Sequence, residues 1–176
     1  MPRPADTAAP RNRVLDTQAA GDHLDRLHRL AWSLCGSPHL ADELTQETYA
    51  RVLARPRRLR DGNDFHYLAR SLRNVAHDHW RAERRRPRLV GGTALDDQPS
   101  RHGDPELATA ASEVFAAVAR LSPPLRDAVG HVDVAGMSYA EAAEALGVPI
   151  GTVMSRLHRA RARVAAELAP AQAIAA

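Results

Sequence analysis

The stretch SYAEAAEALGVPIGTVMSRLHRARAR, residues 138–163, predicts two helices separated by a tight turn. Ser138 and Glu141 stand three residues apart, which is the spacing of a capping box at the start of a helix. Gly147 suits the left-handed conformation that ends a helix, and Pro149 disfavours its continuation. We therefore expect the first helix to end at Gly147 and a second helix to start at Thr152.

The second predicted helix is rich in arginine. Val153 and Leu157 lie four residues apart, so they share one face, which we expect to be buried. A short helix that supports a second, basic helix is the helix-turn-helix arrangement that enters a DNA major groove. An ordinary helical hairpin with a solvated basic face is the alternative, because a motif needs structural context. The outer face would carry Ser155, Arg156, His158, Arg159 and Arg163.

Composition limits the class of protein. The chain has 176 residues, of which 44% are hydrophobic, so it can bury a core as one domain or two small ones. Cys35 is the only cysteine, which excludes an internal disulfide and a multi-cysteine zinc site. No apolar run approaches membrane-spanning length, and the N-terminus lacks the apolar core of a signal peptide. These features favour a cytoplasmic protein without membrane insertion.

Charge is strongly segregated along the chain. Residues 51–90 hold twelve arginines against four acidic residues, net +8, and residues 151–176 hold four against one, net +3. Between them, residues 91–150 hold three arginines against nine acidic residues, net −6. Two basic blocks separated by an acidic one indicate two surfaces that face polyanions. Arginine supplies every basic residue, and its planar fork suits phosphate and guanine.

Helical periodicity dominates the rest of the chain. We predict a first helix from Asp22 to Gly36, a second from Ser37-Pro38, and a long third helix from Phe65 to Arg85. Helices resume at Pro105. No stretch shows a convincing strand alternation, so we expect an all-α fold.

We expect two small helical domains joined by a flexible linker. Residues 1–20 are rich in alanine, proline and charge and are predicted to be a flexible N-terminal arm. Residues 88–105 carry turn formers without a period and are predicted to be the linker. The two domains would then span residues 21–87 and 106–169, with a tail at residues 170–176.

Most of the remaining candidate residues have a plain structural interpretation. His77 and His79 flank Asp78, but residues this close on a helix point in different directions, so they do not form a metal site. Cys35 is interpreted as a buried apolar side chain. The Arg-rich helix with Tyr67 and Trp80 favours nucleic-acid binding, since arginine neutralises phosphates and aromatic rings stack on bases. No phosphate-binding or nucleophile motif is present, so we expect no enzyme activity.

Together these segments resemble the extracytoplasmic-function (ECF) sigma factors of the sigma-70 family, subunits of bacterial RNA polymerase. Three stretches carry the resemblance. ADELTQETYARVL (41–53) resembles the core-binding helix, and FHYLARSLRNVAHDHWRAERRRP (65–87) resembles the promoter-melting and upstream-duplex helix. LSPPLRDAV (121–129) with MSYAEAAEALGVPIGTVMSRLHRARARV (137–164) resembles the C-terminal DNA-binding domain.

The resemblance implies a role for each surface. An acidic face would dock on the clamp coiled coil of the polymerase, and the C-terminal domain would meet the flap. The basic loop and long helix would capture a base flipped from the −10 element, and the helix-turn-helix would read the −35 element. The resemblance assigns core binding to Asp42, Glu43, Gln46 and Glu47. It assigns the −10 region to Arg58, Asn63, Phe65, Arg73, Asn74, Asp78, Arg81, Arg84 and Arg85, and the −35 element to Thr152, Ser155, Arg156, His158 and Arg159.

Some residues depart from the family pattern. Met154 stands where a basic residue is frequent, and Gly130 with His131 interrupts a normally apolar run. An anti-sigma factor is a further partner to consider. The terminal Ala175-Ala176 resembles tags read by ATP-dependent bacterial proteases, although an incidental alanine-rich tail explains it equally. A stand-alone helix-turn-helix regulator is the alternative function, but it would leave the acidic face and the arginine-rich helix without a role.

Overall fold

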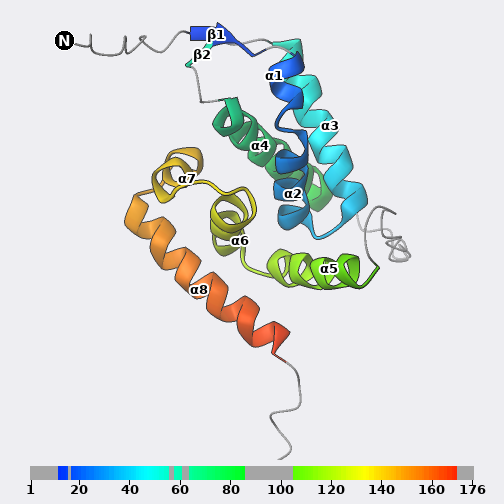
Figure 1. Ribbon diagram of the computed structural model, residues 1–176, viewed down its shortest axis with the longest axis vertical. Helices are drawn as coiled ribbons and strands as arrows, with labels where there is room; N and C mark the ends of the chain where they lie inside the picture. Colours follow the sequence, from blue (N-terminus) through cyan, green and yellow to red (C-terminus); the bar gives the residue numbers. More distant parts are fainter. Residues whose placement is uncertain (1–11, 16, 56–57, 61–63, 86–104, 170–176) are drawn as a thin grey trace, which may run out of the picture.

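The structure is a computed structural model that describes residues 12–15, 17–55, 58–60, 64–85 and 105–169. These residues are almost entirely helical, which confirms the predicted all-α class (Figure 1). The N-terminal helices are α1 (Thr17–Gly21), α2 (Leu24–Cys35), α3 (Pro38–Ala54) and α4 (Asp64–Arg85). The C-terminal helices are α5 (Pro105–Ala119), α6 (Pro123–Val129), α7 (Tyr139–Leu146) and α8 (Ile150–Leu168), with a π-helical turn, η1 (Gly130–Val134), directly after α6.

Local sequence signals set most helix ends where they were predicted. Gly36 ends α2 in the left-handed conformation, with φ 75°, and its N–H donates to the Trp32 carbonyl. Ser37 caps α3, because its hydroxyl accepts from the Leu40 N–H at 3.3 Å. Helices resume at Pro105, as predicted, although the rest of the predicted linker, residues 88–104, lies outside the described residues.

A short antiparallel strand pair was not predicted. Strand β1 (Asn12–Val14) pairs with β2 (Arg58–Arg60), with Arg13 opposite Leu59. Three residues are too few to show a hydrophobic alternation, so periodicity could not reveal them. The prediction that residues 1–20 form a flexible arm is therefore wrong for residues 12–15 and 17–20: β1 is hydrogen-bonded into the pair, and Leu15 and Ala20 are buried. The Tyr49 hydroxyl also donates to the Ala20 carbonyl at 2.8 Å.

Helices α2, α3 and α4 pack around a common core. Leu27 and Leu30 of α2, and Leu68 and Leu72 of α4, are fully buried there. The buried positions of α4 recur at helical spacing, as its sequence predicted. Most charged residues of α3 and α4 thereby lie on the outer faces, whereas Asp64, the first residue of α4, is buried.

The C-terminal helices contact the N-terminal helices directly. Helix α5 lies against α2, η1 also contacts α2, and α7 contacts α4 (Figure 1). Met137 and Ala142 belong to the same apolar cluster as Leu27, whereas Leu157 of α8 belongs to a smaller cluster with α6. The two sets of helices therefore share a hydrophobic core in this arrangement, and their predicted division into domains at residues 87 and 106 stays a prediction.

Candidate nucleic-acid and polymerase interfaces

The acidic face of α3 is exposed, as its sequence predicted. The Asp42 carboxylate lies 3.0 Å from the His28 imidazole, and the Glu43 carboxylate lies 3.7 Å from that of His39. Such exposed pairs stabilise a fold only slightly, so they leave these side chains able to exchange partners. All four residues assigned to core binding, Asp42, Glu43, Gln46 and Glu47, lie exposed on this helix.

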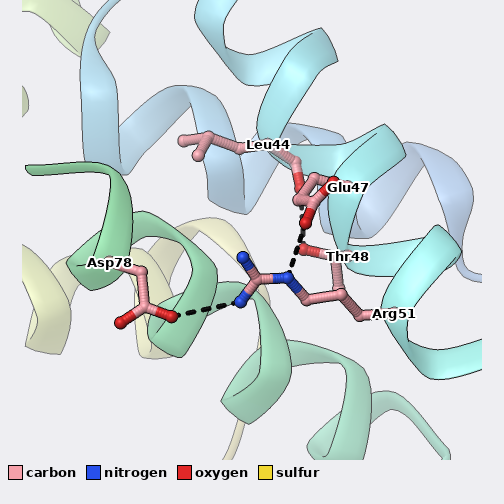
Figure 2. Close-up of polar contacts among 5 residues, drawn as sticks. All are labelled: Leu44, Glu47, Thr48, Arg51 and Asp78. Carbon is pink, nitrogen blue, oxygen red and sulfur yellow. Dashed lines mark hydrogen bonds and ion pairs between the residues drawn. The ribbon is translucent and has the colours of Figure 1, made fainter. Parts of the chain in front are cut away.

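Arg51 connects two residues that were assigned to different partners. Its Nε donates to the Glu47 carboxylate at 2.6 Å, and its Nη1 donates to the Asp78 carboxylate at 3.1 Å (Figure 2). The hydrogen bond to Glu47 contributes most to raising the pKa of the Arg51 guanidinium, and the hydrogen bond to Asp78 contributes next. On the same helix, the buried Thr48 hydroxyl donates to the Leu44 carbonyl at 2.7 Å (Figure 2). Sequence analysis missed Arg51, although its spacing of four residues from Glu47 is the signal for such a pair.

The outer face of α4 carries the predicted basic surface. Asn74 and Asp78 are exposed along the helix, and Arg81, Arg84 and Arg85 are exposed towards its C-terminal end. Cations at this end also complement the helix dipole. Arg58 is exposed on β2, near in sequence to this helix, and Asn63 lies outside the described residues.

Two residues assigned to the −10 region are engaged within the protein. The Phe65 side chain is only 4% exposed, and the Arg26 guanidinium lies 3.7 Å from its ring centroid. Arg73 places Nε 3.3 Å from the Asp127 carboxylate of α6. The Phe65 side chain therefore presents no open surface to DNA in this arrangement, whereas the paired Arg73 side chain is still 39% exposed.

The helix-turn-helix is confirmed in its local geometry. The Ser138 hydroxyl accepts from the Glu141 N–H at 3.3 Å, and the Glu141 carboxylate accepts from the Ser138 N–H at 2.7 Å, so both bonds of the capping box are present. These bonds also lower the pKa of Glu141. Gly147 ends α7 with φ 66°, in the left-handed region. Helix α8 begins at Ile150, two residues before Thr152, because Pro149 supplies its extended N-terminal flank.

Helix α8 has one buried face and one exposed, mainly polar face. Val153 and Leu157 are buried, as predicted. The opposite face also carries two exposed apolar residues, Ile150 and Met154, which are 48% and 51% exposed. Of the residues assigned to the −35 element, Ser155, His158 and Arg159 are exposed, whereas Thr152 and Arg156 are half-buried.

Internal pairs involve two arginines of α8. Arg159 donates from Nε to the Ser155 carbonyl at 3.2 Å. Arg161 makes a two-pronged pair with the Asp133 carboxylate, through Nε at 3.0 Å and Nη2 at 2.5 Å. Hydrogen bonding to Asp133 raises the pKa of Arg161, which therefore stays charged. Two arginines of the cationic α8 surface are thus oriented within the protein, Arg159 by the Ser155 carbonyl and Arg161 by the Asp133 carboxylate.

His131 is fully buried, and its burial was not predicted from the sequence. The side chain is fully buried in η1, and its Nδ1 lies 2.8 Å from the Asp127 carbonyl. Because a carbonyl can only accept, Nδ1 carries the proton, and the buried Nε2 has no hydrogen-bond partner within the described structure. Burial lowers the pKa of His131. The imidazole is therefore held neutral between the two sets of helices.

The described residues contain neither a metal-binding cluster nor a membrane-spanning helix. No group of three or more histidine, cysteine or carboxylate side chains is placed to hold a metal ion. His77 is exposed and His79 is half-buried. No helix in the described ranges is long and apolar enough to span a bilayer. The terminal residues Ala175 and Ala176 lie outside the described residues.

Comparison with known proteins gives a consistent result at the level of sequence. The chain matches the family profile "Sigma-70 region 2" over residues 20–86 and "Sigma-70, region 4" over residues 112–164. It is 36% identical over 146 residues to the ECF RNA polymerase sigma factor SigE of Mycolicibacterium smegmatis, covering 79% of this chain and 56% of that protein. It is also 36% identical over 135 residues to the ECF RNA polymerase sigma factor SigC of Mycobacterium tuberculosis, covering 74% of this chain and 71% of SigC.

A solved structure agrees with these relatives. The sigma factor RpoE of Bartonella quintana, crystallised in complex with the anti-sigma factor NepR, superposes with a TM-score of 0.67 at 26% sequence identity. The match covers 86% of this chain and 94% of that one. The arrangement of helices is therefore found in a protein with related sequence.

Proposed function

Because this chain belongs to the extracytoplasmic-function sigma factors of the sigma-70 family, we propose that it binds core RNA polymerase, recognises the −10 and −35 elements of a promoter, and helps to melt the first. One observation carries this proposal: an acidic face on α3, an arginine-rich face on α4 and a helix-turn-helix occur in that order on one chain. A stand-alone helix-turn-helix regulator has no use for the first two surfaces.

Core binding is proposed for the acidic face of α3, with the clamp coiled coil of the polymerase as its partner. The exposed carboxylates of Asp42, Glu43 and Glu47 supply the charge, and Gln46 supplies a neutral donor and acceptor among them. Their present partners, His28, His39 and Arg51, are weak competitors because these pairs are exposed. A second contact, between the C-terminal helices and the polymerase flap, would fix the distance between the two DNA-reading surfaces.

Melting of the −10 element is proposed for α4 and the loop before it. Flipping a base out of the duplex costs a few kcal/mol, so stacking and hydrogen bonds must offset that cost. Arginines at the exposed end of α4 would hold the phosphates on either side. The proposed contacts are Arg58, Asn63, Phe65, Arg73, Asn74, Asp78, Arg81, Arg84 and Arg85.

Recognition of the −35 element is proposed for α8. The N-terminal residues of a recognition helix contact base edges, and a good bidentate contact discriminates by about 1–3 kcal/mol. Met154 adds an apolar side chain suited to a thymine methyl group, so the preferred −35 sequence need not follow that of family members with a basic residue there. The proposed contacts are Thr152, Ser155, Arg156, His158 and Arg159.

An anti-sigma factor is proposed as a further partner. The Bartonella RpoE structure contains one, NepR. A protein that binds both sets of helices at once would keep the DNA-reading surfaces from the promoter and keep α3 from the polymerase.

Promoter mapping with reconstituted polymerase tests the function. Core enzyme plus this chain should yield transcripts from genomic DNA whose start sites share two motifs at a constant spacing. Asp42→Asn with Glu43→Gln should weaken core binding, whereas the exposed control pair Glu113→Gln with Glu144→Gln should not. Transcripts without shared motifs, or sequence-specific promoter binding that is independent of core, would contradict the proposal.

A further inference from the structure

The loop between α3 and α4, which is proposed to take part in melting the −10 element, is paired with a strand from the start of the described chain. Strand β2 (Arg58–Arg60) lies within this loop, and β1 (Asn12–Val14) runs antiparallel to it. Figure 1 shows the two strands side by side, next to α1. The proposed sigma function uses the loop but gives β1 and α1 no role.

The strand pair has an inner and an outer face, because neighbouring residues of a strand point to opposite sides. Leu59 of β2 is half-buried and packs against the main core, whereas Arg58 beside it is exposed. Leu15, directly after β1, is 2% exposed within the same core, whereas Val14, the partner of Arg58 in the register, is 45% exposed. The pairing therefore keeps Arg58 on the outer face, where a nucleic acid can reach it.

Helix α1 anchors this end of the chain to both helices that flank the loop. Ala20 of α1 is fully buried, and its carbonyl accepts from the Tyr49 hydroxyl of α3 at 2.8 Å. Burial raises the pKa of Tyr49 to about 12, so the hydroxyl stays protonated and able to donate. Helix α1 also contacts α4, and the His23 ring centroid, after α1, lies 5.6 Å from that of Phe65 in the first turn of α4. The anchor of β1 is thus fixed to the same two helices as the ends of the loop.

Pairing with β1 reduces the conformational freedom of the loop. Helix α3 ends at Ala54 and α4 begins at Asp64, so nine residues, 55–63, connect them, and β2 takes three of these. A backbone that is already ordered does not have to be ordered when DNA binds, so preorganisation raises affinity and selectivity. Strand β2 is therefore held in advance at a fixed place beside α4, and Arg58 with it.

We propose that β1, anchored by Leu15 and α1, is a positioning element for −10 recognition: it holds β2 in place for base reading without itself contacting the base. Substitutions in β1, outside every surface assigned to DNA or polymerase, should then alter discrimination at the −10 element. Discrimination at the −35 element and binding to core should stay unchanged. This inference rests on the proposed sigma function for the identity of the DNA, but the strand pairing itself does not.

Two double variants of the full-length chain separate strand pairing from side-chain effects. Arg13→Pro with Val14→Pro removes two adjacent backbone N–H donors, while proline keeps the chain extended. Successive residues of an antiparallel strand alternate between facing the partner strand and facing away, so one of the two donors lost is one that faces β2. Arg13→Ala with Val14→Ala removes the same side chains but keeps both donors, and is the matched control.

Discrimination is measured with core polymerase on a mapped promoter and on templates that carry one substituted base pair in either element. The ratio of initiation rates on the matched and the substituted −10 template should be about tenfold smaller for the proline variant than for the alanine variant. Ordering the backbone of a single residue on binding corresponds to a change of about this size. The ratio for the −35 element should be equal in both variants.

Amide hydrogen exchange reports on the strand pairing without DNA. Protection of the amides of β2 should be present in the wild-type chain and the alanine variant and lost in the proline variant, while α2, α3 and α4 stay protected. Val14→Gly, which weakens a strand without removing a donor, should lower both the protection and the −10 discrimination to a smaller extent.

Three results would overturn the positioning role: an unprotected β2 in the wild-type chain, loss of its protection with unchanged −10 discrimination, or equal loss of discrimination at both promoter elements. Absence of core-dependent transcription with the wild-type chain would instead remove the sigma function and leave the exchange result standing.

Discussion

Gly130→Ala is a sharp test of the contact between α2 and η1. The glycine has φ −56° and ψ −45°, ordinary helical values, so alanine fits the backbone there. The added Cβ would nevertheless lie 2.8 Å from the Ser33 hydroxyl oxygen and 3.0 Å from a Leu30 methyl carbon. Ser33 and Leu30 are both fully buried, and the Ser33 hydroxyl is bound to the Leu30 carbonyl, so neither can turn towards solvent.

Two opposing effects set the size of the change. Alanine in place of glycine favours a helix by about 1 kcal/mol. Overpacking a tight core costs typically about 1–3 kcal/mol. We therefore expect the free energy of unfolding to fall by about 1 kcal/mol, which corresponds to a Tm lower by roughly 2–4 °C for a chain of this size.

Thermal unfolding followed by far-UV circular dichroism measures the effect. Gly151→Ala is the matched control, because Gly151 lies in α8 and its added Cβ would meet no atom within 4 Å. That variant should gain about 0.5–1 kcal/mol from helix propensity alone. If Gly130→Ala is stabilised as much as Gly151→Ala, there is room beside Gly130, and the packing of η1 on α2 described above is refuted.

Three further predictions concern α8, α7 and η1. Arg159→Ala should weaken binding to −35 duplex by about 1–3 kcal/mol in mobility-shift titrations and leave core binding unchanged; equal loss of core binding would count against its role. Ser138→Ala should lower the free energy of unfolding by about 1 kcal/mol, whereas Ser122→Ala, at a helix start without a side-chain cap bond, should change it little in denaturant titrations. Burial lowers the pKa of His131 below 6.5 in the folded chain. Just under that pH, the His131 imidazole therefore binds a proton in the unfolded chain but not in the folded one. Stability should therefore fall as the pH drops below about 6.5, and the slope should be shallower in His131→Gln; identical slopes would exclude this residue as the cause.

Local signals explain why so many helix ends were predicted correctly. Gly36, Ser37 and the Ser138–Glu141 box act within a few residues of themselves, so the sequence alone is sufficient to place them. The buried face of α8 likewise follows from the spacing of Val153 and Leu157.

Contacts between distant residues explain what was missed. Arg73 and Asp127 are separated by 54 positions, and nothing near either one indicates the other. Phe65 was assigned to a DNA-binding neighbourhood, but its burial depends on Arg26 and on helices whose packing the sequence pattern does not specify. The pairing of β1 with β2 similarly depends on backbone hydrogen bonds, which carry little side-chain signature over three residues.

Run-off transcription on a mapped promoter tests the central claim most directly. Core polymerase, this chain and the template are combined, and reactions lacking the chain or lacking core serve as controls. The account predicts a discrete transcript only when both proteins are present, and its loss when either promoter element is scrambled. A transcript of the same intensity without the chain, or no stimulation of initiation on any mapped promoter, would contradict it.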